Sequence, residues 1–189
     1  MTNHLKNGNS KLHNRLIFDL PTGRTCLNSG SCHKTCYARK AERRFKVVLA
    51  SRIRNLELST DPVTFEKTIH DELNNAKQKF VRIHSSGDFY SQEYINSWGR
   101  IMKKTPHIQF YAYTKVKHLF KWPALKNFNL IDSMIKGQLN YGTKEYVTKL
   151  NKKHGTFLCP ATMTKHEGKV CGNTCTYCMY HNNVAFLQH

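Results

Sequence analysis

Seven cysteines form two tight groups near opposite ends of this 189-residue chain. The first group is Cys26, Cys32 and Cys36, with the spacing C-x5-C-x3-C. The second group is Cys159, Cys171, Cys175 and Cys178, with the spacing C-x11-C-x3-C-x2-C. Close spacing allows several thiolates to converge on one ion or cluster without the closure of a large loop. Because an odd number of cysteines cannot form a fully paired disulfide framework, the pattern favours metal binding.

The split into three and four cysteines predicts one open and one closed site. Three thiolates leave one iron of a [4Fe–4S] cluster without a protein ligand, whereas four thiolates complete the coordination of an iron–sulfur cluster or of Zn²⁺. We therefore expect one or two [4Fe–4S] clusters, with Zn as the alternative for the four-cysteine site. Two other interpretations stay open: a zinc knuckle that only stabilises the tail, and an inert first group. His33 offers a fourth ligand beside the first group.

The charge of the chain points to an anionic partner. Thirty Lys and Arg residues against 12 Asp and Glu give a formal net charge of +18, which attracts polyanions. The densest basic run comprises Arg39, Lys40, Arg43, Arg44 and Lys46. Such a run contacts phosphates without reading sequence, so nucleic acid or a phosphorylated ligand is the expected partner. A solvated helix face explains the run nearly as well.

The amino-terminal residues predict neither a secretory signal nor a membrane anchor. Residues 1–14 are polar and basic and are expected to be flexible, and the longest apolar run covers only residues 47–50, far too few to span a bilayer. We expect a protein of the cytoplasm, where thiols stay reduced and cysteine clusters bind metals. The oligomeric state does not follow from the sequence.

Alternating strand and helix patterns predict a single α/β domain over residues 1–189, with residues 159–189 as a Cys-rich metal-binding segment. The expected strands cover residues 15–20, 79–84, 107–113, 128–134 and 155–158. The expected helices begin at residues 36, 62, 92, 117 and 144. This order favours a parallel sheet with right-handed crossovers, in the form of an incomplete (βα) barrel. Since ligands bind at the carboxyl ends of such strands, we expect both cysteine groups to meet at one mouth of the barrel.

Several blocks resemble the phage-encoded gene product 88 family. They are residues 9–11 (NSK), 18–21 (FDLP), 25–26 (TC), 36–38 (CYA), 82–89 (RIHSSGDF), Trp98, 111–115 (YAYTK) and the closing cysteine group. Residues 171–178 (CGNTCTYC) also match the C-x3-C-x-aromatic-C signature of radical S-adenosylmethionine enzymes, although those enzymes carry it after the first strand. The family looks like a compact relative of radical S-adenosylmethionine barrels, which implies an iron–sulfur protein of phage origin.

The resemblance also implies roles for residues at the expected mouth. Ser86, Gly87 and Asp88 would occupy the segment that holds the amino group of S-adenosylmethionine, unless Asp88 only caps the next helix. Tyr113 would line the same cofactor site. Lys115 could pair with a carboxylate or phosphate, and His84 could act as an acid or base, although a strand histidine is more often a core residue.

We therefore expect reductive cleavage of S-adenosylmethionine at the first cysteine group, with an electron donor as a partner and an unidentified substrate, for which nucleic acid is a candidate. The competing expectation is a non-catalytic protein that uses Fe–S or zinc for stability and its charge to bind nucleic acid or a host partner. The small size of the chain and the unusual C-x5-C-x3-C spacing favour this second class.

Overall fold

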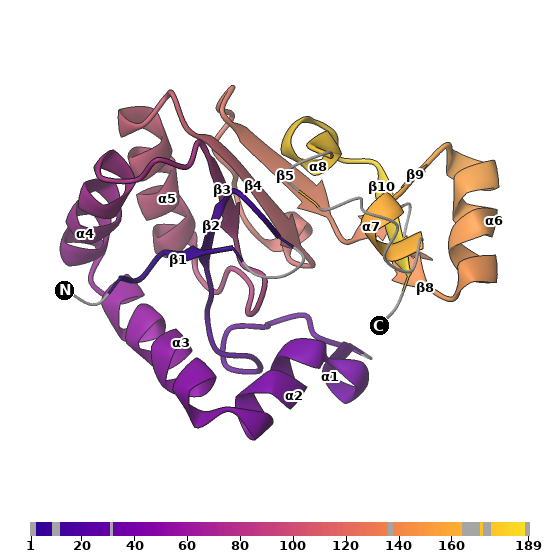
Figure 1. Ribbon diagram of the computed structural model, residues 1–189, viewed down its shortest axis with the longest axis horizontal. Coiled ribbons are helices and arrows are strands. Elements are labelled where there is room, and N and C mark those ends of the chain that lie inside the picture. Colours follow the sequence, from indigo (N-terminus) through magenta and orange to yellow (C-terminus); the bar gives the residue numbers. More distant parts are fainter. Residues whose placement is uncertain are drawn as a thin grey trace.

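The computed structural model describes residues 3–8, 12–30, 32–135, 138–163, 171 and 175–187, and its centre is a five-stranded sheet (Figure 1). The strands in order are β1 (Lys6–Asn7), β2 (Leu16–Phe18), β3 (Phe80–Ile83), β4 (Gln109–Thr114) and β5 (Phe128–Asp132). β1 pairs with β2 in the antiparallel sense, and the other neighbours pair in parallel. The carboxyl ends of β2, β3, β4 and β5 therefore lie at the same end of the sheet, and the loops that follow these strands begin there.

Helices connect the parallel strands and cover one face of this sheet (Figure 1). The connections contain α3 (Lys46–Ser59), α4 (Pro62–Asn74), α5 (Gln92–Lys104) and the 3₁₀ turn η1 (Lys117–Leu119). The predicted start of α4 is confirmed, since the Asp61 carboxylate accepts a hydrogen bond from the Val63 amide at 3.2 Å and thereby caps the helix. Ser91 caps α5 in the same manner.

Alternation along the strands gives the sheet two apolar faces. Val81 and Phe110 pack towards the helices, where Phe65 and Trp98 stack edge to face with ring centroids 5.3 Å apart. Tyr111, next along β4, belongs to a second cluster on the opposite face. Because successive side chains of a strand point to opposite faces, both faces of the sheet need a covering layer.

The carboxyl-terminal part of the chain supplies that second layer. It contains the hairpin β6 (Met134–Ile135) and β7 (Gln138–Leu139), the strands β8 (Tyr141–Gly142), β9 (Phe157–Leu158) and β10 (Val184–Leu187), and the helices α6 (Lys144–His154), α7 (Pro160–Met163) and α8 (Tyr177–Tyr180). The order β8-β10-β9 forms a separate parallel sheet. The expected strand at residues 155–158 therefore exists as β9, but it does not extend the main sheet.

The parallel strands β2, β3, β4 and β5 lie in sequential order, which is the order of strands in a (βα) barrel. β1 and β5 are the two edges of the main sheet, so the sheet is open, and the incomplete barrel stays a prediction. Part of the segment 1–14, expected to be flexible, forms β1, and Leu5 beside it is buried.

The helix expected from residue 36 onward is interrupted. α1 (Cys32–Thr35) and α2 (Tyr37–Arg44) precede α3, and the extended backbone of Phe45 separates α2 from α3. Arg52 donates to Glu42 Oε1 at 2.9 Å and to the carbonyl oxygen of Ala38 at 3.1 Å. In one straight helix, residues 42 and 52 would lie about 15 Å apart. The Glu42–Arg52 ion pair therefore holds α2 folded back against α3.

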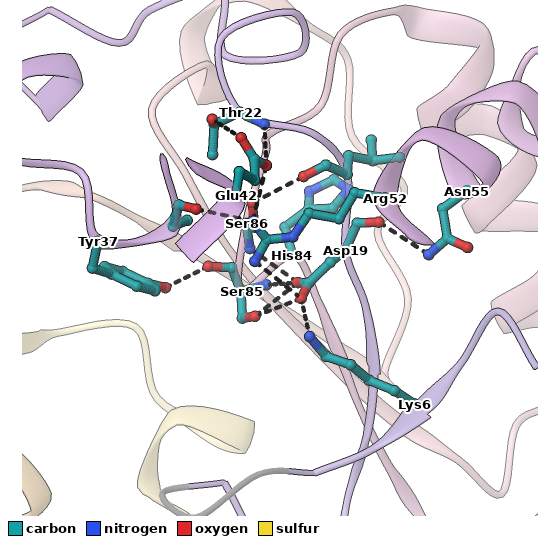
Figure 2. Close-up of polar contacts among 12 residues, drawn as sticks. Lys6, Asp19, Thr22, Tyr37, Glu42, Arg52, Asn55, His84, Ser85 and Ser86 are labelled. Atoms are coloured by element: carbon teal, nitrogen blue, oxygen red, sulfur yellow. Dashed lines mark hydrogen bonds and ion pairs between the residues drawn. The ribbon is translucent and has the colours of Figure 1, made fainter. Parts of the chain in front are cut away.

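A buried carboxylate, Asp19, joins the elements around the end of β2 (Figure 2). It accepts hydrogen bonds from the ammonium of Lys6, from the amide and hydroxyl of Ser85 at 2.7 and 2.8 Å, and from the amide of Ser86 at 2.9 Å. The Arg52 guanidinium lies 3.9 Å away. Burial alone raises the pKa of Asp19, but Lys6, Arg52 and Ser85 outweigh it and lower the pKa below its ordinary value.

His84, a candidate acid or base, is a core residue instead. It is 3 % exposed, its Nε2 lies 2.8 Å from the Tyr94 hydroxyl, and its ring packs on Phe89. Its φ of +63° is in the left-handed region, and Nδ1 has no hydrogen-bond partner. Burial, with a further contribution from Arg82, lowers the pKa of His84 to about 3, against the opposing effect of Asp19. His84 is therefore a packed core histidine, in agreement with the alternative interpretation of the sequence.

Replacement of Asp19 tests whether its network supports the fold. We expect Asp19→Asn to lower the free energy of unfolding by about 3 kcal/mol, because Arg52 is then left buried with a weakened anionic environment. Asp71→Asn is the matched control, since the Asp71 carboxylate is exposed and its partners are the Lys67 ammonium at 2.6 Å and the His70 ring at 4.0 Å; no measurable change is expected. Urea denaturation at pH 7 measures both variants, and equal stabilities would contradict the central role of Asp19.

The depressed pKa of His84 predicts an acid-sensitive fold. In the unfolded chain the imidazole binds a proton below pH 6.5, whereas the buried ring binds one only near pH 3. Stability is therefore complete above pH 6.5 and falls by up to about 1.4 kcal/mol per pH unit between these values. His84→Gln should reduce this slope in urea denaturation at pH 7, 5.5 and 4.5, while His107→Gln at an exposed position should keep it. Parallel pH profiles for His84→Gln and the unaltered chain would refute the assignment.

Candidate metal centres

The first cysteine group lies at the carboxyl ends of the parallel strands. Cys26 is in the loop after β2, Cys32 begins α1, and Cys36 separates α1 from α2. The thiols of Cys32 and Cys36 are hydrogen bonded to each other, and the Lys115 ammonium and the Tyr141 hydroxyl also hydrogen bond to Cys32. The structure thus brings together the three cysteines of the predicted open site and adds a cation beside them.

The surroundings separate the acidities of these three thiols. The pKa of Cys32 is lowered to about 5, mainly by a hydrogen bond from Cys36, with smaller contributions from Lys115 and Tyr141 and against the opposing effect of burial. The same hydrogen bond raises the pKa of Cys36. Burial raises the pKa of Cys26, and the nearby Asp88 and Cys32 add to the increase, while the Gly23 amide opposes it. Cys32 is therefore the thiolate of the group near neutral pH.

Hydrogen bonds hold the cysteine loop against the strand ends. The Thr25 hydroxyl donates to the carbonyl oxygen of Pro21 at 2.9 Å, and the Asn28 amide donates to the carbonyl oxygen of Lys115 at 3.1 Å. The Tyr37 hydroxyl donates to the carbonyl oxygen of Ser85 (Figure 2). The loop is thus attached to the ends of both β3 and β4, which fixes the first group over this edge of the sheet.

The predicted cofactor turn, Ser86, Gly87 and Asp88, lies at the same edge but has structural contacts. The Ser86 hydroxyl donates to the carbonyl oxygen of Leu20 at 2.9 Å. Gly87 has φ +81°, and a Cβ there would lie 2.7 Å from both the Leu20 Cβ and the Thr25 Oγ1, so only glycine fits. Ser86 and Gly87 therefore position the cysteine loop.

Asp88 connects β3 to β4 beyond their ends. Its Oδ1 accepts from the Thr114 hydroxyl and the Phe89 amide, both at 2.8 Å, and its Oδ2 accepts from the Lys115 amide at 3.0 Å. Burial raises the pKa of Asp88, while these donors and the Lys115 charge oppose the increase. The residue that caps the next helix, α5, is Ser91 and not Asp88. Asp88 therefore positions Lys115.

The positions of Tyr113 and Tyr141 differ from what the sequence predicts. Tyr113 was expected beside the Ser86–Asp88 turn, but it hydrogen bonds with Cys178 of the second group, and the Arg82 guanidinium lies 5.2 Å from its ring centroid. Alternation along β4 explains this placement, since Tyr113 and Tyr111 share the face that the carboxyl-terminal layer covers. Tyr141, whose ring lies 5.2 Å from the Lys115 ammonium, carries no sequence signal and was missed.

The second cysteine group lines one small cavity of about 10 Å³. Its walls are Arg15, Phe157, Cys159, Cys171, Cys175, Thr176, Cys178 and Met179. Burial raises the pKa of Cys178 to about 12, with Cys159 and Cys171 adding to the increase and Tyr113 and Arg82 opposing it. All four cysteines of the predicted closed site thus face a common space.

The expectation that both groups meet at one mouth is wrong. The second group lies over the face of the main sheet, beside residues at the amino ends of strands: Gln109 donates to the carbonyl oxygen of Met179 at 2.8 Å, and Asn129 donates to that of Cys178 at 3.0 Å. α1 and α8 accordingly lie far apart in Figure 1. The physical reason is that Cys159 follows β9, which belongs to the separate sheet.

Neither group is a preassembled metal site. Among the residues that the structure describes, no three Cys, His, Asp or Glu side chains are arranged as ligands of one metal ion. His33, proposed as a fourth ligand, is exposed on α1. Residues 9–11 of the family resemblance, residues 172–174 of the cysteine motif, and residues 164–170 and 188–189 of the Cys-rich segment lie outside the described part of the chain. Metal binding therefore stays a prediction that the donor set supports.

The basic run lies on α2 and the start of α3, next to the first cysteine group. Lys40, Arg43, Arg44 and Lys46 are exposed, and Arg39 is half-buried. None of the described helices is both long enough and apolar enough to cross a bilayer.

Comparison with known proteins identifies relatives in bacteriophages. The chain is 34 % identical to the gene 88 protein of Mycobacterium phage L5 and 33 % identical to that of Mycobacterium phage D29, in each case over an alignment 125 residues long that covers 59 % of this chain. Those residues cover 52 % of each relative, so the chain spans about half the length of the curated relatives it matches. No solved structure matches the chain.

The names of these relatives state no activity, but they support the predicted phage origin. The family model described as "Gene product 88" matches residues 2–153, which include the first cysteine group and the whole main sheet. The resemblance noted in the sequence is thereby confirmed at the level of the family. The chain belongs to the gene product 88 family.

Proposed function

We propose that this protein is an iron–sulfur enzyme whose cluster is held by Cys26, Cys32 and Cys36 and whose co-substrate is S-adenosylmethionine. The observation that carries the proposal is the convergence of these thiols with Lys115 at the carboxyl ends of four sequentially ordered parallel strands. Sulfur donors suit iron–sulfur clusters and zinc. The four remaining cysteines would form a second, closed site without a catalytic role.

The number of thiols at the first group decides the kind of chemistry. Held by three thiolates, a [4Fe–4S] cluster would keep one iron open to the amino and carboxylate groups of S-adenosylmethionine. One electron from an external donor would then cleave the sulfonium C–S bond into methionine and a 5′-deoxyadenosyl radical, which becomes 5′-deoxyadenosine when it takes a hydrogen atom from the substrate. A fourth protein thiolate would block that position. The separation of the second group from the first therefore favours the open site.

The neighbouring residues would bind and orient the small molecule. The Lys115 ammonium is a partner for a carboxylate, and it is kept at the site by the Asn28 and Asp88 hydrogen bonds to its backbone. Among the described residues, Asp88 Oδ2 accepts a hydrogen bond from the Lys115 amide alone, which leaves one of its lone pairs for an ammonium. The Tyr141 ring lies 5.2 Å from the Lys115 ammonium.

Metal content and product formation test this proposal together. Protein purified without oxygen should contain about four iron and four sulfide per chain, and with dithionite and S-adenosylmethionine it should release 5′-deoxyadenosine, measured by liquid chromatography. Cys32→Ser should abolish the iron and the product. If protein reconstituted with both metals contains zinc but no iron, the proposal is wrong.

Cys178→Ser is the matched control for the assignment of cysteines to sites. Because Cys178 belongs to the second group, this variant should keep the iron of the first site and the release of 5′-deoxyadenosine. Lys115→Met should keep the iron as well, while it raises the concentration of S-adenosylmethionine needed for half-maximal turnover. Loss of iron in Cys178→Ser but not in Cys32→Ser would instead place the catalytic cluster at the second group.

A specific surface favours nucleic-acid binding as a second candidate function. Beside the basic residues of α2 and α3, two aromatic side chains are exposed, Tyr37 at 54 % and Phe45 at 49 %. The Arg44 guanidinium lies 5.3 Å from the Phe45 ring centroid. Cations that contact phosphates and rings that stack on bases are the two components of single-strand binding. A solvated helix face needs no exposed rings, so the surface favours a nucleic-acid partner.

Salt dependence distinguishes this surface from general basicity. The triple variant Arg43→Ala, Arg44→Ala and Lys46→Ala should weaken the binding of single-stranded DNA and reduce the slope of log Kd against log salt by about 2. The triple variant Lys144→Ala, Lys152→Ala and Lys153→Ala on α6 removes the same charge from exposed positions elsewhere. Fluorescence anisotropy between about 50 and 300 mM salt compares the two variants. If both triple variants weaken DNA binding equally, the surface on α2 and α3 is not a specific nucleic-acid site.

A further inference from the structure

The wall of the four-cysteine cavity contains a buried arginine that is incompletely hydrogen bonded. Arg15 is 1 % exposed and lies directly before β2. Its Nε donates to the carbonyl oxygen of His13 at 3.1 Å, and its Nη1 donates to the Tyr111 hydroxyl. Its Nη2 is buried and has no hydrogen-bond partner. Such a donor destabilises a fold unless an anion or another acceptor satisfies it.

The charges around this cavity are uncompensated. Arg15 forms no ion pair with any carboxylate of the described residues. A second guanidinium, that of Arg82, lies over the Tyr113 ring and close to Cys178. The described cavity wall thus contains one cation, Arg15, with Arg82 close to it at Cys178, and the four thiols are the acidic groups among the lining residues. Four thiolates around one divalent ion carry a net charge of −2, which two guanidinium groups balance.

The size of the cavity restricts its occupant. A space of about 10 Å³ corresponds to about one water-sized sphere. A [4Fe–4S] core contains eight atoms and does not fit this space, whereas a single ion does. Zn²⁺ prefers four thiolates in a tetrahedral arrangement.

We propose that Cys159, Cys171, Cys175 and Cys178 bind one divalent metal ion, and that Arg15 is the positioning residue that balances the charge of this tetrathiolate through its free Nη2. The inference rests on the second, closed site of the proposed function but not on catalysis at the first group. The main chain supports the pairing, because the His13 amide donates to the carbonyl oxygen of Cys171 at 3.0 Å. Metal binding would therefore connect the segment before β2 to the carboxyl-terminal layer.

The test uses the full chain and zinc itself as the probe. Competition with a chromophoric chelator gives the zinc affinity, and the contribution of the second group is the part that Cys178→Ser abolishes. Arg15→Met should weaken this contribution about 10- to 100-fold, as loss of an outer hydrogen bond to a metal ligand does. Cobalt substitution should show the charge-transfer bands of a tetrathiolate in the unaltered chain.

A second readout separates charge balance from a merely structural role. When a chelator has removed the metal, Arg15→Met should be at least as stable in urea denaturation as the unaltered chain, because the variant removes a buried, incompletely paired charge. With zinc, the order of stability should reverse. If Arg15→Met does not fold, Arg15→Gln provides the same comparison with a polar side chain.

The outcomes test the single-ion site and the role of Arg15 separately. Zinc binding that depends on Cys178 but is equally tight in Arg15→Met overturns the role of Arg15 and leaves the closed site standing. Iron with sulfide at the second group, or no metal binding that depends on Cys178, overturns the single-ion site itself. Neither result affects the test of 5′-deoxyadenosine release at the first group.

Discussion

The carboxylate of Asp19 is the interaction on which the arrangement at the strand ends depends. It follows β2 directly and binds the amides that follow β3, so the ends of two strands share one acceptor. Lys6 connects it to β1, and Arg52 connects it through Glu42 to α2. Burial of a charge is unfavourable unless hydrogen bonds and counter-charges surround it. This requirement fixes the relative positions of β1, β2, β3 and α3 more narrowly than apolar packing alone would.

The network around Asp19 also positions the first cysteine group. Glu42 accepts hydrogen bonds from the Thr22 amide at 2.9 Å and from the Thr22 hydroxyl, so the chain between β2 and Cys26 is attached to the same network (Figure 2). Gly87 packs against that loop from the other side. The same polar network therefore positions the loop that carries the three thiols.

Much of the main sheet could be predicted from the sequence, because its signals are local. Period-two runs before turn residues mark β3 and β4, and the Asp61-Pro62 pair marks the start of α4. The break at Phe45 could not be predicted, since it depends on the Glu42–Arg52 ion pair between residues ten apart. The strand β10 and its place between β8 and β9 depend on contacts between segments distant in sequence, which periodicity does not report.

The same distinction applies to the two cysteine sites. The grouping of the cysteines followed from their spacing, and the structure places each group together. Their relative placement depended on the sheet to which the strand before Cys159 belongs, which no local pattern shows. Arg15 and Tyr141 were missed because a single arginine or tyrosine is common on any surface. Arg15 is distinguished by its burial beside the second cysteine group, and Tyr141 by its hydrogen bond to Cys32.

The position of β10 also determines the order in which the protein assembles during synthesis. The strands of the main sheet are complete once residue 132 has been made, so that sheet can form early on the ribosome, since chains fold from the amino terminus. β10 forms both pairings of the second sheet, which therefore cannot form before residues 184–187 emerge. Until then the apolar face that carries Tyr111 and Ile131 lacks its cover, and the nascent chain presents it to the ribosome surface or to chaperones.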